Sequence, residues 1–443
     1  MTKERPYPQV GKADFPNLEE RVLDRWEKDN TFQVSVDSKP EESEYVFYDG
    51  PPFANGLPHH GHLLTGYVKD VVPRFQTMKG KKVERRFGWD CHGLPAEMEV
   101  EKELQVSGRS EITKYGIDKF NERCEESVLR FTEEWEKTVV RQARWVDFEN
   151  DYKTMDPSYM ESVMWAFKQL WEKDLIYEAF RVMPYSWGAE TPLSNFEIRL
   201  DDATRPRQDP AVTVAFDLDT KENESGRVRL LAWTTTPWTL PSNLALAVGA
   251  EIEYSKLKDS DGTIWIIASN ALNRYEEQLE DMEDIGTIKG SELLGKKYEP
   301  LFDFFNYRTD AFKVLQADWI DDQEGTGIVH MAPGFGEDDQ TVCEANDIPI
   351  GDVVPVDDKG CYTKEVKNWS GMNVFDANPE IISTLKSSGQ LLRHDSYEHN
   401  YPHCWRTDTP IIYKAISSWY VKVTDLTEQL LANNQAINWI PGH

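Results

Sequence analysis

The chain has 443 residues, of which 39% are hydrophobic and 29% charged, so it can bury apolar cores in two to four domains of ordinary size. Asp and Glu outnumber Lys and Arg by 78 to 49, and the net charge of −29 argues against a general DNA-binding surface. No segment is apolar enough for a membrane helix or a secretion signal, and the five scattered cysteines suit a reduced compartment, so we expect a cytoplasmic protein.

The first part of the chain reads as alternating strands and helices. An apolar stripe at helical spacing runs over residues 64–75, with a kink expected at Pro73, and a Gly/Pro-rich loop precedes it. We further expect helices at 17–29, 113–145 and 157–174, and strands at 45–49 and 82–87. This order is typical of a parallel α/β sheet.

The pattern becomes β-rich near residue 205. Strands are predicted at 211–216, 228–233, 263–267 and 325–330, and again at 410–413 and 418–422. We therefore divide the chain into 1–200, the N-terminal helix and first part of an α/β domain; 201–395, an inserted β-rich domain; and 396–443, an incomplete return into the α/β domain.

A histidine-containing loop lies between the predicted strand 45–49 and the next helix. Free N–H groups and the dipole at a helix N-terminus favour anions, and imidazoles placed there can donate to phosphates. His59 and His62 are candidates for this role, and Gly61 would let a nucleotide approach the backbone closely. The alternative is a solvated loop in which the histidines occur together by chance.

A second segment, Gly-Trp-Asp-Cys-His-Gly-Leu-Pro-Ala-Glu, begins at Gly88 near the end of the next predicted strand. Open α/β sheets bind their ligands at such strand ends, which makes Asp90 a candidate partner for a ligand amine. The alternative is an aspartate that forms a turn or caps a helix.

Together the two segments resemble the signatures of the isoleucyl-tRNA synthetases, which are class I aminoacyl-tRNA synthetases, and the similarity covers essentially the whole chain. The resemblance implies an α/β fold in which a Rossmann-type catalytic domain is interrupted by a β-rich editing domain. It implies that His59, Gly61 and His62 bind the ATP phosphates. It further implies that Gly50 and Pro51 line the isoleucine pocket and that Asp90 binds the α-amino group. The segment from Gly88 argues against the valine-specific relatives.

Two further strings lie in the β-rich part. One runs from Trp233 to Asn243 and contains three adjacent threonines, and the other contains His330 and Asp339. A threonine run is usually strand surface, and a single histidine is usually a hydrogen-bonded core or loop residue.

Both strings resemble the editing site of the isoleucyl-, valyl- and leucyl-tRNA synthetases. The resemblance implies that His330 contacts the terminal ribose and helps exclude isoleucine, and that Asp339 holds the α-amino group of misattached valine. A missing methylene is worth only about 1–3 kcal/mol in an apolar pocket, and isoleucine against valine is the standard example, so a second sieve is needed. The residues implied to line the pocket itself are Thr234, Thr235, Thr236 and Asn243.

The family's Lys-Met-Ser-Lys-Ser loop and anticodon-binding domain do not occur in these 443 residues, so we expect an N-terminal piece that favours editing over synthesis. ATP with Mg²⁺ is the expected substrate complex. No structural zinc is expected, because the segments that match the family's cysteine pairs retain only Cys404.

The preferred hypothesis is an isoleucine–tRNA ligase with a deacylase activity on Val-tRNA(Ile). Its expected partners are tRNA(Ile), L-isoleucine and ATP, with no DNA or membrane partner, and we expect a monomer. The alternatives are a free-standing editing hydrolase for aminoacyl-tRNA and a non-catalytic tRNA-binding module, which the net charge disfavours.

Overall fold

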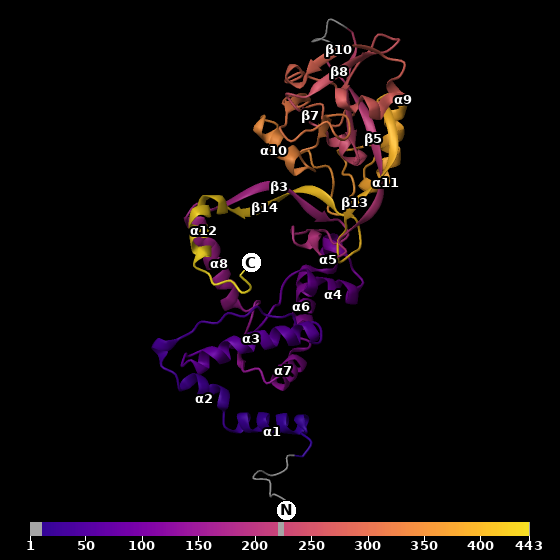
Figure 1. Cartoon of the computed structure of the whole chain (residues 1–443). Helices are drawn as coiled ribbons and strands as arrows, with labels where there is room; N and C mark the ends of the chain where they lie inside the picture. Colours follow the sequence, from indigo (N-terminus) through magenta and orange to yellow (C-terminus); the bar gives the residue numbers. More distant parts are fainter. Residues whose placement is uncertain (1–10, 220–225, 443) are drawn as a thin grey trace, which may run out of the picture. The chain divides into compact units, whose positions relative to one another are not determined.

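The computed structural model describes residues 11–219 and 226–442, and the chain divides into two compact units, residues 1–174 and 175–443 (Figure 1). Helices and multi-stranded sheets occur together, which confirms the predicted α/β class. Within the described ranges, no helix combines the length and apolar character needed to cross a membrane.

Unit 1 is mainly helical around one pair of parallel strands. The pair is β1 (Arg86–Trp89) and β2 (Asp147–Lys153), in which Gly88 faces Tyr152. A Cβ atom on Gly88 would lie 2.2 Å from Cζ of Tyr152, so only glycine fits there. The helices are α1 (Phe15–Lys28), α2 (Thr31–Asp37), α3 (His60–Met78), α4 (Leu94–Leu104), α5 (Gly108–Tyr115), α6 (Ile117–Val128), α7 (Thr132–Arg141) and α8 (Pro157–Glu172).

The core of unit 1 forms where β1 meets α7. Phe87 and Trp89 of β1 are each 2% exposed, and they pack with Trp135 and Val139 of α7. The indole N–H of Trp89 donates to Asp151 Oδ2 at 2.6 Å, which ties β1 to β2 by a side-chain bond as well.

Unit 2 contains a six-stranded sheet in the order β10-β8-β9-β6-β5-β13 and a three-stranded sheet in the order β11-β7-β12. The first comprises β5 (Thr204–Asp217), β6 (Val228–Thr234), β8 (Glu253–Lys258), β9 (Ile264–Ala268), β10 (Glu283–Lys289) and β13 (Leu391–Pro402). The second comprises β7 (Ala245–Val248), β11 (Lys313–Gln316) and β12 (Ile328–Met331).

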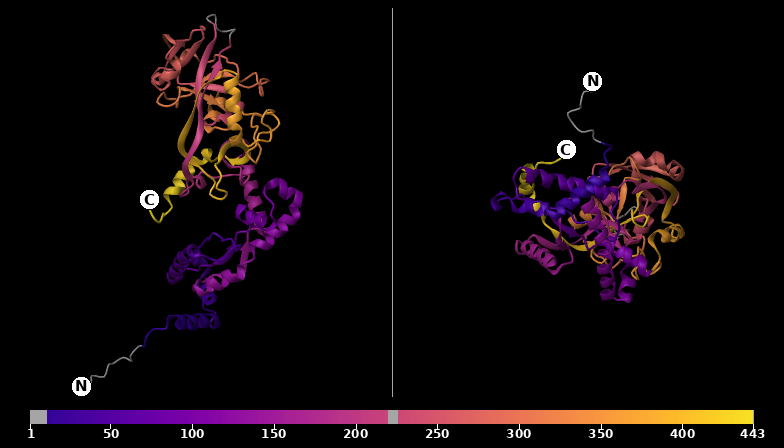
Figure 2. Two further views of the ribbon diagram at one scale, coloured as in Figure 1. Left: turned by 90° about the vertical axis from the view of Figure 1, so that its right-hand side faces the viewer. Right: turned by 90° about the horizontal axis from the view of Figure 1, so that it is seen from below.

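A third sheet, in the order β14-β3-β4, joins distant parts of unit 2. β3 (Ile176–Ser186) and β14 (Ile412–Val421) run antiparallel over the whole of β14, side by side in Figure 1, and β4 (Thr191–Pro192) adds an edge. The helices of the unit are α9 (Glu276–Leu279), α10 (Glu337–Ala345), α11 (Val374–Ser387) and α12 (Thr427–Gln435). Figure 2 shows α11 lying alongside β5.

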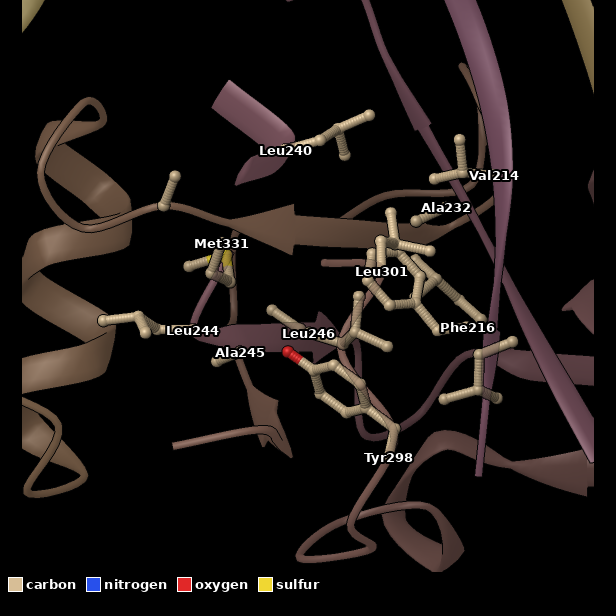
Figure 3. Packing of buried hydrophobic residues seen from close by; sticks show 14 of the residues in the cluster. Val214, Phe216, Ala232, Leu240, Leu244, Ala245, Leu246, Tyr298, Leu301 and Met331 are labelled. Atoms are coloured by element: carbon tan, nitrogen blue, oxygen red, sulfur yellow. The ribbon is translucent and has the colours of Figure 1, made fainter. Parts of the chain in front are cut away.

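The core of unit 2 forms between the six-stranded sheet and the sheet β11-β7-β12. Figure 3 shows Val214 and Phe216 of β5 facing Leu246 of β7, with Tyr298 and Met331 beside them. Phe216 and Leu246 are fully buried. This packing fixes the strands that carry the threonine and histidine motifs.

An ion-pair cluster closes the end of β5. Asp217 Oδ1 accepts from Nε of Arg227 at 2.7 Å and from Nε of Arg229 at 2.9 Å. Burial raises the pKa of Asp217, but these bonds outweigh burial and hold the pKa below its usual 3.8. The carboxylate therefore stabilises the folded sheet while it is charged.

Several sequence expectations are confirmed and others are wrong. α1 and α3 form close to the predicted ranges, and α3 continues through Pro73. The predicted strand 45–49 is absent, since only Glu44 forms a bridge, with Lys82. The predicted helix 113–145 is wrong as one helix, because it covers the end of α5, then α6 and α7, and stops at Arg141. The first break lies at Gly116, whose φ is 112°, and at the second Phe131 N–H donates to the carbonyl of Ala54 at 3.0 Å. Residues 410–413 and 418–422 belong largely to one strand, β14, because β3 pairs along all of it.

The domain boundary predicted at 200/201 lies just before β5, and the one predicted at 395/396 lies inside β13. The two compact units of the structure meet at 174/175.

Candidate functional site

The loop before α3 brings His59 and His62 together at the helix N-terminus. His59 is the N-cap, and its Nδ1 accepts from the N–H of Gly61 at 3.1 Å. Nδ1 of His62 accepts from the N–H of His59 at 3.2 Å, and the two rings stack with centroids 3.6 Å apart. Because both Nδ1 atoms accept, each neutral ring carries its hydrogen on Nε2, a donor suited to a phosphate.

The double cap favours a residue without a side chain at position 61. A Cβ atom there would lie 3.0 Å from Cε1 and 3.1 Å from Nδ1 of His59, so a side chain would push the capping ring aside. Burial lowers the pKa of His62, and the neighbouring His59 and Lys69 lower it further. The neutral, capping form of the ring is therefore favoured.

Gly50 and Pro51 lie at the start of the same loop. The carbonyl of Gly50 accepts from Nζ of Lys69 at 2.8 Å, and the carboxylate of Asp49 pairs with both Lys69 and Arg144. Pro51 lines an open cleft of about 900 Å³, whose other walls include aromatic side chains from β2 and α8. The cleft is large enough for an amino acid.

Asp90 follows β1 directly. Its backbone N–H donates to the carbonyl of Pro52 at 2.9 Å, and its Oδ1 accepts from the N–H of His92 at 3.4 Å, as expected for a turn. The lining of the cleft includes Pro51 but not Asp90, and His62 lines a separate, smaller pocket. His62 and Pro51 thus line two different pockets of unit 1.

In unit 2 the threonine motif forms the turn at the end of β6. Thr234 Oγ1 accepts from the N–H of Thr236 at 3.1 Å, and Thr235 lies half-buried between them. The chain then enters a 3-10 helix, Pro237–Ser242, where the hydroxyl of Thr239 donates to the carbonyl of Thr236 at 2.8 Å. The hydroxyl of Thr236 thereby lies within hydrogen-bonding distance of those of Thr234, at 3.2 Å, and Thr239, at 3.3 Å.

His330 lies on β12 and reaches this turn. Its Nε2 is 2.8 Å from Oγ1 of Thr239, and its Nδ1 is 3.2 Å from Nδ2 of Asn243. The side chain is buried, and burial lowers the pKa of His330 to about 4. The ring is therefore neutral near pH 7 and hydrogen-bonded on both sides, as a core histidine would be. One of its two partners, Asn243, belongs to the predicted site.

Asp339 lies in the first turn of α10, shortly after β12. Its Oδ2 accepts from the N–H of Ala332 at 2.7 Å. Burial raises the pKa of Asp339 to about 6, although the bond from Ala332 opposes the shift. Within the described ranges the structure joins Asp339 to the end of the His330 strand and forms no hydrogen bond from its carboxylate to the threonines.

Two residues of this network were missed as candidates from the sequence. Thr239 belongs to the threonine motif, and its spacing of three residues from Thr236 is the available signal, since that spacing suits a 3-10 turn. Tyr298 donates from its hydroxyl to Oδ1 of Asn243 at 2.6 Å, and nothing in its local sequence indicates this.

The side chains that could bind a metal ion are dispersed in the described part of the chain. Among residues 11–219 and 226–442, no three or more His, Cys, Asp or Glu side chains are grouped so as to hold a metal ion. Burial raises the pKa of the Cys404 thiol, but hydrogen bonds from Ser186 and Thr407 outweigh this and lower it. The absence of structural zinc stays a prediction.

Comparison with known proteins decides the family. The family model "tRNA synthetases class I (I, L, M and V)" matches residues 21–443. The chain belongs to the class I tRNA synthetases. This family match and the mixed α/β structure agree with the fold class predicted from the sequence.

Individual relatives of this class I synthetase chain are named more specifically. The chain is 56% identical over 450 residues to "Isoleucine--tRNA ligase" of Rickettsia peacockii (strain Rustic). This alignment covers 100% of the chain and 41% of the relative. The chain is also 56% identical over 448 residues to the ligase of the same name from Rickettsia canadensis (strain McKiel), with the same coverage. The chain thus spans about 41% of the length of these relatives. Among solved structures, the editing domain of the P. falciparum cytosolic leucyl-tRNA synthetase matches 43% of the chain and 99% of its own, at 11% identity and a TM-score of 0.31.

Proposed function

We propose that this chain is the part of an isoleucine–tRNA ligase that hydrolyses mischarged Val-tRNA(Ile) in unit 2 and contributes ATP and isoleucine binding in unit 1. The observation that carries the proposal is the buried network from Thr234 to His330 and Asn243, with a half-buried Asp339 bonded to Ala332 at the end of the His330 strand. The editing domain would be the inserted segment 201–395. The reaction would take place in the cytoplasm, with tRNA(Ile), L-isoleucine and ATP as partners of a monomer.

The hydrolytic step would depend on positioning. His330 is neutral and bonded at both ring nitrogens, so it is poorly placed to accept a proton from water. The hydroxyls of Thr234, Thr235 and Thr236 would instead orient a water molecule and the ester, with Asn243 completing the pocket wall. His330 would contact the terminal ribose and exclude isoleucine, which is one methylene larger than valine.

Asp339 would hold the α-ammonium group of the valyl ester. With a pKa of about 6, its carboxylate is charged at pH 7.5, and its partial burial strengthens an ion pair with the ammonium. A bound ammonium would also relieve the cost of burying the unpaired charge.

In unit 1 the double cap of α3 would meet the ATP phosphates. Nε2–H of His59 and of His62 would donate to phosphate oxygens, and Gly61 keeps the backbone accessible. Mg²⁺ would enter bound to ATP and neutralise part of its charge. Gly50 and Pro51 would border the isoleucine side chain, and Asp90 would hold the α-amino group.

The second candidate is a free-standing editing hydrolase, and one observation favours it: the whole threonine–histidine network lies within unit 2. The two functions differ in unit 1. Binding of ATP that is weakened by His62→Ala supports the ligase, whereas no binding of ATP at millimolar concentration supports the hydrolase.

The proposed function is tested by deacylation of purified Val-tRNA(Ile) and Ile-tRNA(Ile) by the whole chain. We expect faster loss of valine than of isoleucine, abolished by Asp339→Ala and retained in Asp338→Ala, which removes the neighbouring exposed carboxylate. Hydrolysis of neither ester above the rate in buffer would contradict editing by this chain.

A further inference from the structure

Tyr298 is a buried residue outside every motif considered above. It lies in the core between the six-stranded sheet and the sheet β11-β7-β12, and its backbone forms a bridge with Leu218. Figure 3 shows its hydroxyl directed towards β7 near Ala245. That hydroxyl donates to Oδ1 of Asn243 at 2.6 Å.

The amide of Asn243 has only one orientation that its neighbours accept. Nδ2 is 2.8 Å from the carbonyl oxygen of Ala245, which can only accept, so the NH₂ end must face it. Oδ1 then faces the hydroxyl of Tyr298, which satisfies the buried oxygen. The second hydrogen of Nδ2 remains for Nδ1 of His330.

The tautomer of His330 follows from both sides of its ring. Nδ1 faces an N–H donor on Asn243, so Nδ1 must be the acceptor. On the other side, Thr239 gives its single hydroxyl hydrogen to the carbonyl of Thr236, so its oxygen must accept from Nε2–H of His330. The hydrogen bonds on both sides of the ring thus fit the same neutral tautomer.

We propose that Tyr298 is a positioning residue which, by fixing the amide of Asn243, holds His330 as the neutral Nε2–H tautomer. A proton added at Nδ1 would point at the N–H of Asn243, so this arrangement opposes the imidazolium as well. His330 is then a rigid wall of the pocket and takes no part in proton transfer. Only this catalytic consequence rests on the proposed function, because the tautomer itself is a property of the folded chain.

The tautomer is measured directly by nitrogen NMR of the whole chain labelled with ¹⁵N-histidine. The His330 signals are assigned from their loss in His330→Gln. In the native chain we expect Nδ1 to have the shift of an unprotonated ring nitrogen and Nε2 that of a protonated one. In Asn243→Asp a carboxylate replaces the donor, and we expect the hydrogen to move to Nδ1.

Tyr298→Phe tests the positioning role. Without the hydroxyl, Oδ1 of Asn243 is buried without a partner and only the carbonyl of Ala245 still orients the amide. We therefore expect a weaker hydrogen bond to Nδ1 of His330 and a shifted Nδ1 signal, while Nε2 stays protonated. Tyr275→Phe is the matched control, since Tyr275 is also buried and its hydroxyl bonds Thr213 at 2.9 Å. Native signals in Tyr298→Phe, or a native chain protonated at Nδ1, would overturn the inference.

Deacylation of Val-tRNA(Ile) separates this inference from the proposed function. We expect Tyr298→Phe to lower kcat about tenfold, the size of one lost hydrogen bond, with KM nearly unchanged, and Tyr275→Phe to retain the native rate. An inactive native chain with the expected NMR signals would refute the proposed function and leave the tautomer inference standing. Expected NMR shifts in Tyr298→Phe with an unchanged kcat would refute its catalytic consequence alone.

Discussion

Asp339→Asn is expected to stabilise unit 2 at neutral pH while it removes the proposed editing activity. Burial raises the pKa of Asp339 from 3.8 to about 6, so the folded chain binds this proton more tightly than the unfolded chain does. At 1.36 kcal/mol per pKa unit, the charged carboxylate costs the fold about 3 kcal/mol at pH 7.5. Asparagine keeps the shape and still accepts from Ala332 N–H, but it carries no charge.

The sign of the pH dependence distinguishes this account from others. A group whose folded pKa is raised destabilises the fold above that pKa, and the cost disappears as the pH falls to the unfolded value. The gain from Asp339→Asn should therefore decline from about 3 kcal/mol at pH 7.5 to about 1 kcal/mol at pH 4.5.

Urea denaturation of both chains at the two pH values, followed by tryptophan fluorescence, measures this difference. Glu337→Gln is the control, because it removes a charge from the exposed surface of the same helix turn and should change stability little at either pH. A gain of equal size at both pH values, or a loss at pH 7.5, would refute the reasoning from burial.

Three further substitutions test the packing and the ion pairs, each by denaturant unfolding of the unit concerned. Gly88→Ala should cost unit 1 about 3 kcal/mol, since the new methyl group would overlap the ring of Tyr152, whereas Gly56→Ala has nothing within 4 Å and should be nearly neutral; equal effects would contradict this. Asp217→Asn should cost about 2 kcal/mol at pH 7, and because the folded pKa is lowered, that cost should fade as the pH drops below 3.8; a cost that persists there would exclude the ion pairs as its cause. Phe216→Ala should cost about 4 kcal/mol, because the ring is fully buried; a loss under about 1 kcal/mol would mean that the core closes around the gap.

Local sequence patterns predicted the elements whose conformation depends on neighbouring residues along the chain, such as α3. The stripe on α3 and the position of the histidine loop at its N-terminus need only helical spacing and a helix start, whereas the capping by His59 and His62 appears only in the structure. The segment 45–49 failed because an apolar run does not supply a partner strand, and Tyr48 is 90% exposed in the structure. β2 was missed because its polar sequence lacks alternation, and its pairing with β1 decides its conformation.

The candidate site shows the same limit. The sequence indicated Asn243 and His330 through their motifs, but their hydrogen bond joins positions 87 residues apart. Tyr298 is 55 residues from its partner Asn243 and carries no local signal, so only the folded core identifies it. Whether a buried histidine is an acceptor or a donor depends on such neighbours, which a sequence motif does not name.

The antiparallel pairing of β3 with β14 has a consequence for the order of folding. Ile176 faces Val421, so this pair can close only after nearly the whole of unit 2 has been brought together. Closing so long a loop is entropically costly until the intervening sheets are compact, whereas β5 and β6 lie close in sequence and can pair early. We therefore expect the amides of β14 to gain protection from hydrogen exchange after those of β6. Protection of β14 amides would then mark the point at which the sheets between β3 and β14 have folded.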